Sequence, residues 1–157
     1  MSVVVLTPDE LAQGIAIASR RRISCIFGRK TAQHYDDKNG EEWSTEIESA
    51  CAEIAVCKHY NQYWTGGVFS GSRADFDAGQ GRQVRHTVFA NGHLLVYAED
   101  KDEDAIVLVT GKAPEYCLAG WLYAHEAKAN ESWWRTDARC PCWWVPQNSL
   151  RQVRPLR

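Results

Sequence analysis

The spacing of hydrophobic and polar positions changes once along the chain. Over the first sixty or so residues, apolar side chains recur every three to four positions, the period of a helix that packs on one face. From Gly66 onward they follow the alternating or continuous patterns of strands. This order predicts helices first and consecutive strands afterwards, which is typical of an α+β protein.

The first expected helix begins after Thr7. Thr7 can act as the N-cap, Pro8 suits the first helical position, and Glu10 is the reciprocal partner of a capping box. The three cations at 20–22 fit a helix end, where the dipole favours positive charge. We therefore expect a helix that runs to about Arg20. Its apolar stripe is Leu11, Ile15 and Ala18.

A second helix is expected from Thr45, which forms another capping-box pattern with Glu48. Glu46 and Glu53 are seven positions apart, so they share a side at the border of the apolar face. The helix dipole explains an acid in the first turn, such as Glu46, but not Glu53 in the middle of the helix. Glu53 is therefore a candidate functional residue. The face itself comprises Ile47, Ala50, Cys51, Ile54 and Lys58.

The remainder predicts a mostly antiparallel sheet of four to five strands, in one domain that spans residues 1–157. Asn91-Gly92 is a strong hairpin signal, which predicts that the strands on either side of it pair. A short helical turn at 124–130, an edge strand at 143–145 and a brief helix at 146–150 complete the expected elements. The expected strands are 67–70, 82–90, 93–99, 105–110 and 115–123.

Composition and charge narrow the class of protein. A net charge of -2 gives no global basic surface of the kind that marks many nucleic-acid binders, so any nucleic-acid site must be a local patch. Six cysteines without a secretion signal predict reduced thiols in a cytoplasmic protein. No window approaches the roughly 18 apolar residues of a membrane span, so we expect no membrane partner.

The segment 74–87 carries the strongest sign of chemistry. Asp75 and Asp77 precede a glycine-containing turn, and strand alternation then places Gln83, Arg85 and Thr87 on one face. Hydrolysis of a phosphodiester needs a hard cation that polarises the phosphate and activates water. Magnesium prefers oxygen ligands from one or two carboxylates. Acids at a turn beside polar strand positions therefore predict a metal and phosphate site.

These residues resemble the PD-(D/E)XK nuclease superfamily. Ala52-Glu53-Ile54-Ala55 on a helix, an acid at the turn and Gln83-Val84-Arg85 on the next strand carry the resemblance, which covers about residues 45–123. It implies a restriction-endonuclease-like core, hydrolysis of DNA with Mg²⁺ or Mn²⁺, and a possible homodimer. It also assigns roles to single residues. Asp77 is the first metal ligand with Asp75 as its competitor, and Gln83 is the second ligand. Glu53 adds a ligand, directly or through water, and Arg85 takes the position of the lysine.

Two departures from the motif leave alternative functions open. Gln83 is a neutral amide in place of a carboxylate, and Arg85 stays protonated, so it cannot act as a general base although it can clamp a phosphate. One alternative is a catalytically inactive protein of nuclease fold that binds nucleic acid or a protein. The other is an unrelated interaction module that uses the Trp-rich part at 124–157, with its Trp133-Trp134 and Trp143-Trp144 pairs.

Overall fold

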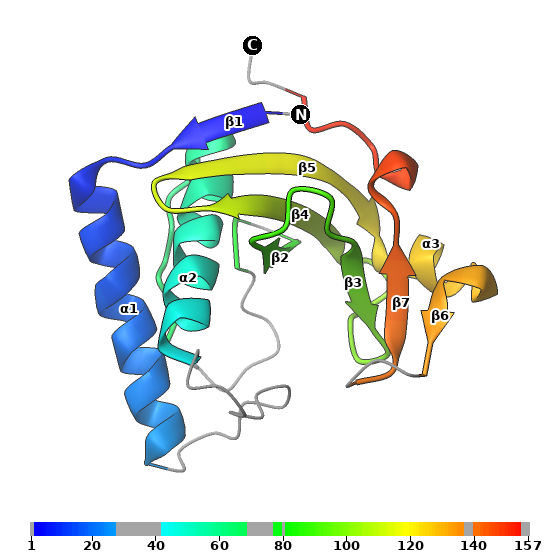
Figure 1. The fold of residues 1–157 in the computed structure, drawn as a ribbon, viewed down its shortest axis with the longest axis horizontal. Coiled ribbons are helices and arrows are strands. Elements are labelled where there is room, and N and C mark those ends of the chain that lie inside the picture. Colours follow the sequence, from blue (N-terminus) through cyan, green and yellow to red (C-terminus); the bar gives the residue numbers. More distant parts are fainter. Residues whose placement is uncertain (1, 28–41, 69–76, 80, 137–139, 155–157) are drawn as a thin grey trace.

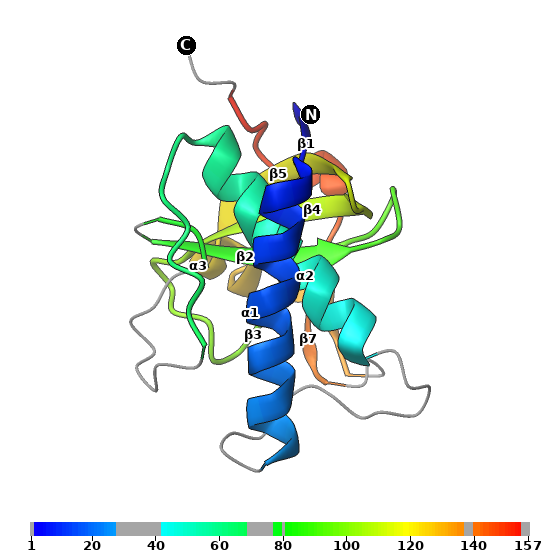
Figure 2. The ribbon, with the colours of Figure 1, turned by 90° about the vertical axis from the view of Figure 1, so that its left-hand side faces the viewer.

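A computed structural model describes residues 2–27, 42–68, 77–79, 81–136 and 140–154. Two long helices lie on one side of a four-stranded sheet, and a smaller three-stranded sheet lies on the other side (Figures 1 and 2). The α+β class predicted from the sequence is therefore confirmed. The elements are β1 (Ser2–Val5), α1 (Pro8–Ile26), α2 (Glu42–His59), β2 (Arg82–Thr87), β3 (Leu94–Tyr97), β4 (Ala105–Lys112), β5 (Glu115–Tyr123), α3 (Ala124–Lys128), β6 (Trp134–Arg135) and β7 (Cys142–Val145), with 3₁₀ turns at Glu131–Trp133 and Gln147–Ser149.

The larger sheet has the strand order β1-β5-β4-β2. β5 pairs antiparallel with both β1 and β4, whereas β2 pairs parallel with β4 in the register Arg82 to Ala105 through Thr87 to Thr110. Strand alternation gives this sheet two buried faces. Val107, Val109 and Leu118 pack with α2, while Ile106 and Leu108 pack with the smaller sheet.

The smaller sheet, ordered β3-β7-β6, corrects the predicted hairpin. Asn91-Gly92 does form a turn, in which the Gly92 N–H donates to the Phe89 carbonyl. The strands that flank the turn nevertheless belong to different sheets, because β3 pairs antiparallel with β7 and buries Leu94 and Val96 in the second core cluster. The segment at 143–145 is likewise central in its sheet rather than at the edge, and the predicted strand 67–70 is not a strand at residues 67 and 68.

The predicted start of α1 is confirmed, whereas its predicted end and the predicted start of α2 are corrected. The Thr7 N–H donates to the Glu10 carboxylate at 2.7 Å, and the Glu10 N–H donates to Thr7 Oγ1 at 3.3 Å. α1 continues to Ile26, past the three arginines, because Arg21 and Arg22 find carboxylate partners on α2. α2 begins at Glu42, so Thr45 lies inside the helix, and Glu48 accepts a 2.6 Å hydrogen bond from the Tyr116 hydroxyl instead of capping.

α2 lies between α1 and the sheet and is buried on nearly every side from Ala50 to Cys57. A helix that is apolar all round needs such a position. Gly14 of α1 permits the close approach, since a Cβ there would lie 2.6 Å from Cys51 Sγ. This packing fixes the side of α2 that carries Glu53. In the described part of the chain, no helix is both long and apolar enough to cross a membrane.

Candidate functional site

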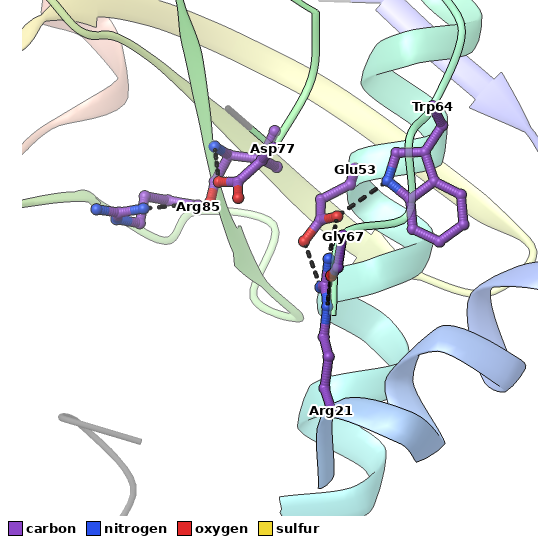
Figure 3. A network of polar contacts seen from close by, with 7 residues as sticks. Arg21, Glu53, Trp64, Gly67, Asp77 and Arg85 are labelled. Atoms are coloured by element: carbon purple, nitrogen blue, oxygen red, sulfur yellow. Dashed lines mark hydrogen bonds and ion pairs between the residues drawn. The ribbon is translucent and has the colours of Figure 1, made fainter. Parts of the chain in front are cut away.

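The predicted functional carboxylate Glu53 lies in a buried ion pair between the two long helices. Arg21 of α1 donates to both of its oxygens, at 2.6 and 2.9 Å, and the Trp64 indole N–H donates to one of them at 3.0 Å (Figure 3). Arg21 also donates to the Gly67 carbonyl at 2.9 Å. The arginine fork is thus fully oriented, and both Glu53 oxygens already have charged or polar donors.

Asp77 lies at the free edge of β2, close to Glu53. Its Oδ2 accepts a 2.8 Å hydrogen bond from the Val84 N–H, which closes the turn ahead of the strand. Burial raises the pKa of Asp77, while the Val84 N–H, Arg85 and Arg21 oppose that rise. Burial also raises the pKa of Glu53 to about 7; the Asp77 charge adds to this rise, whereas Arg21 and Trp64 oppose it. The charge of Asp77 therefore affects the ionisation of Glu53.

Arg85 points to the other side of β2. Val84 packs into the core beneath α2, so its neighbours Gln83 and Arg85 face away from the helices, as strand alternation requires. Arg85 donates to Asp100 at 2.6 Å and its guanidinium lies 5.4 Å from the centre of the Tyr97 ring. Figure 3 shows the Arg85 side chain directed away from Glu53, with Asp77 between them.

This arrangement does not fit a divalent cation held by Glu53, Asp77 and Gln83. Arg21 neutralises the charge of Glu53. Gln83 extends from the sheet face opposite the one on which α2, the helix that carries Glu53, packs. The described residues hold no group of three or more His, Cys, Asp or Glu side chains that could bind a metal ion. The competing ligand Asp75 lies outside the described residues.

A cavity of about 920 Å³ lies elsewhere on the helix side of the same sheet. α2 ends at His59, which leaves the last positions of the sheet face open beyond its final turn. The C-terminal segment forms another wall, where Arg151 bridges to Trp121 through hydrogen bonds of 2.9 and 3.0 Å between their backbones. The lining residues are Tyr60, Gly81, Arg82, Glu103, Ala105, Val107, Trp121, Tyr123, Arg151, Gln152 and Arg154.

The cavity combines cations with aromatic rings. The Arg82 guanidinium lies 4.2 Å from the centre of the Tyr60 ring and donates to Gln62 at 3.1 Å. Among the described residues, no carboxylate pairs with Arg82 or with the exposed Arg154. Arg151 differs, because Glu126 binds it at 2.5 and 2.6 Å. Two arginines are thus available to an anionic ligand.

Sequence reasoning missed this cavity. Trp121 and Tyr123 are two positions apart on a predicted strand, so a shared face with two aromatic rings was readable from the sequence. Arg82 opens a predicted strand, but nothing local indicates that Arg151 and Arg154 reach the same place from the end of the chain.

No protein family model matches this chain, and neither the curated proteins nor the solved structures yield a similar protein.

Proposed function

We propose that this protein binds nucleic acid through the cavity lined by Arg82, Arg154 and Trp121, and does not cleave it. The observation that carries the proposal is the presence, in one cavity and beside aromatic rings, of two arginines that pair with no carboxylate in the described part of the chain. Guanidinium groups bind phosphate oxygens bidentately, and aromatic or guanidinium planes stack on bases. A local site of this kind is compatible with a net charge of -2.

The buried pair of Arg21 and Glu53 supports binding without cleavage. A catalytic carboxylate must offer free oxygens to a metal ion or to water. Both Glu53 oxygens instead accept hydrogen bonds, from Arg21 and Trp64. The role of Glu53 in this arrangement is therefore to join α1 to α2. The proposal corresponds to the inactive alternative that the departures at Gln83 and Arg85 left open.

Fluorescence anisotropy with a labelled DNA oligonucleotide, in EDTA, tests the binding. We expect saturable binding that falls about tenfold or more in Arg154→Ala and Arg82→Ala, because a hydrogen bond to a charged group contributes about 1.5–3 kcal/mol. Arg20→Ala is the matched control, since Arg20 is an exposed arginine of α1 that does not line the cavity. Equal losses in Arg154→Ala and Arg20→Ala would assign the binding to general charge and refute the site.

A second candidate is a nuclease of PD-(D/E)XK type that uses Mg²⁺ or Mn²⁺. It is favoured by one observation, the closeness of Asp77 to Glu53 that raises the Glu53 pKa. That function would require Arg21 to leave Glu53 when a metal binds. Incubation with linear, circular and single-stranded DNA in manganese tests it. Cleavage that is lost in Asp77→Ala would support the nuclease, and the absence of cleavage and of calorimetric manganese binding would support the binding protein.

A further inference from the structure

The cavity contains two kinds of arginine with different chemistry. The guanidinium of Arg151 is held in one orientation, since both of its terminal nitrogens donate to Glu126 and the Arg151 backbone is hydrogen-bonded to that of Trp121. Its guanidinium lies 5.0 Å from the centre of the Trp121 ring and 5.8 Å from that of Tyr123. Because Glu126 neutralises its charge, Arg151 offers a fixed planar surface rather than a free cation.

Arg82 and Arg154 supply the free positive charge. Tyr60 and Gln62 orient Arg82, and both are neutral, so no hydrogen-bond or ion-pair partner among the residues that the structure describes offsets its charge. The Arg154 backbone is fixed by a 2.9 Å contact between its carbonyl and the His59 ring, while its side chain is exposed. The cavity thus joins a stacking surface to a pair of cations.

A planar surface beside a pair of cations matches a single nucleotide unit. The cations suit a phosphate, and the guanidinium of Arg151 suits the flat face of a base. The faces of bases are hidden inside a duplex, which exposes only base edges in its grooves. A cavity that stacks on a base face can therefore be filled only by an unpaired base.

We propose, building on the nucleic-acid binding proposed above, that this cavity holds one unpaired nucleotide, with its base on Arg151 and its phosphate between Arg82 and Arg154. The protein then selects single strands over duplex. The cavity volume of about 920 Å³ suits a ligand of this size. Glu126 acts as a positioning residue, because it fixes the orientation of the Arg151 guanidinium plane.

Strand selectivity is tested by anisotropy with three labelled DNAs of equal charge. These are a single strand without self-complementary sequence, the same strand with abasic sites throughout, and a blunt hairpin that has the same number of nucleotides and an abasic loop. We expect the single strand to bind about fivefold or more tightly than the abasic strand, the range for stacking of one base. We expect the hairpin to bind no better than the abasic strand.

The variant Arg151→Lys tests the planar guanidinium of Arg151 separately from its positive charge. The variant keeps a cation for Glu126 but loses the flat guanidinium, so it should weaken binding of the normal strand about fivefold and leave the abasic strand unchanged. Arg20→Lys, on the exposed part of α1, should change neither. The salt dependence should have a slope of about -0.7 in log K against log salt for the single phosphate held by Arg82 and Arg154, and Arg154→Ala should make this slope less steep.

The outcomes separate this inference from the proposed function. Equal affinity for hairpin and single strand, or an equal effect of Arg151→Lys on normal and abasic strands, would overturn the unpaired-nucleotide site and leave nucleic-acid binding standing. No binding of any of the three DNAs by the wild-type protein would overturn both. The comparison of normal and abasic strands uses the wild-type protein, so it does not depend on the folding of a variant.

Discussion

Replacing Arg21 by methionine tests whether the ion pair with Glu53 holds the helical layer together. The side chains of Arg21 and Glu53 are only 13% and 8% exposed, and the substitution would leave Glu53 buried beside Asp77 with Trp64 as its remaining donor among the described residues. Removal of one partner of a buried pair costs about 3–5 kcal/mol. For a chain of this length we expect the melting temperature to fall by about 6–12 °C for a loss of about 3 kcal/mol.

The loss should depend on pH, with a sign that follows from the raised pKa of Glu53. Below the ordinary glutamate range, the carboxyl is protonated in both the folded and the unfolded states, so it has no ionisation cost. Between the ordinary glutamate range and about pH 7, the unfolded chain ionises Glu53 while the folded state still holds the proton, so stability falls across this window and levels off above it. Without Arg21 that pKa rises further, so Arg21→Met should be more destabilising at pH 8 than at pH 5.5.

Urea unfolding, followed by tryptophan fluorescence at both pH values, measures the effect. The double variant Arg21→Met with Glu53→Gln provides the control, because the amide cannot ionise. We expect the double variant to be more stable than Arg21→Met at pH 8 and to show a smaller pH dependence. A double variant that is no more stable than Arg21→Met at pH 8 would refute the explanation that the loss comes from the buried, unpaired charge of Glu53.

The other predictions concern packing, a hydrogen bond and thiol reactivity. Gly14→Ala should destabilise the protein by about 1 kcal/mol despite the better helix propensity of alanine, because its Cβ meets Cys51 Sγ; adding Cys51→Ala should restore stability in thermal unfolding. Tyr116→Phe should cost about 1–2 kcal/mol in urea unfolding, since it removes the hydroxyl donor to Glu48, and an unchanged stability would contradict that role. Burial raises the pKa of the Cys57 thiol to about 11, so a thiol reagent at pH 8 should modify it only after unfolding; rapid reaction in the native protein would contradict its burial. The same protection is expected for the buried thiols Cys51 and Cys142.

The sequence by itself determined the elements whose signals are local. The capping box of Thr7 and Glu10 lies within four residues, so it fixes the start of α1 wherever that helix packs. The alternation along 82–87 likewise separated Arg85 from Val84, and the continuous apolar run at 105–110 marked a strand buried on both faces. These features depend on the geometry of neighbouring residues, which the sequence contains.

Only the tertiary structure decided which elements became neighbours. β2 and β3 flank a good hairpin turn, yet they separate because Leu94 and Val96 bury in a different cluster from Val84. Arg21 meets Glu53 across 32 positions, which turns a candidate metal ligand into half of an ion pair. Arg82 and Arg154 likewise line one cavity only because the fold brings these distant parts of the chain together. Apolar faces select their partners by the total area they bury, and that sum is set by the whole chain rather than by any local segment.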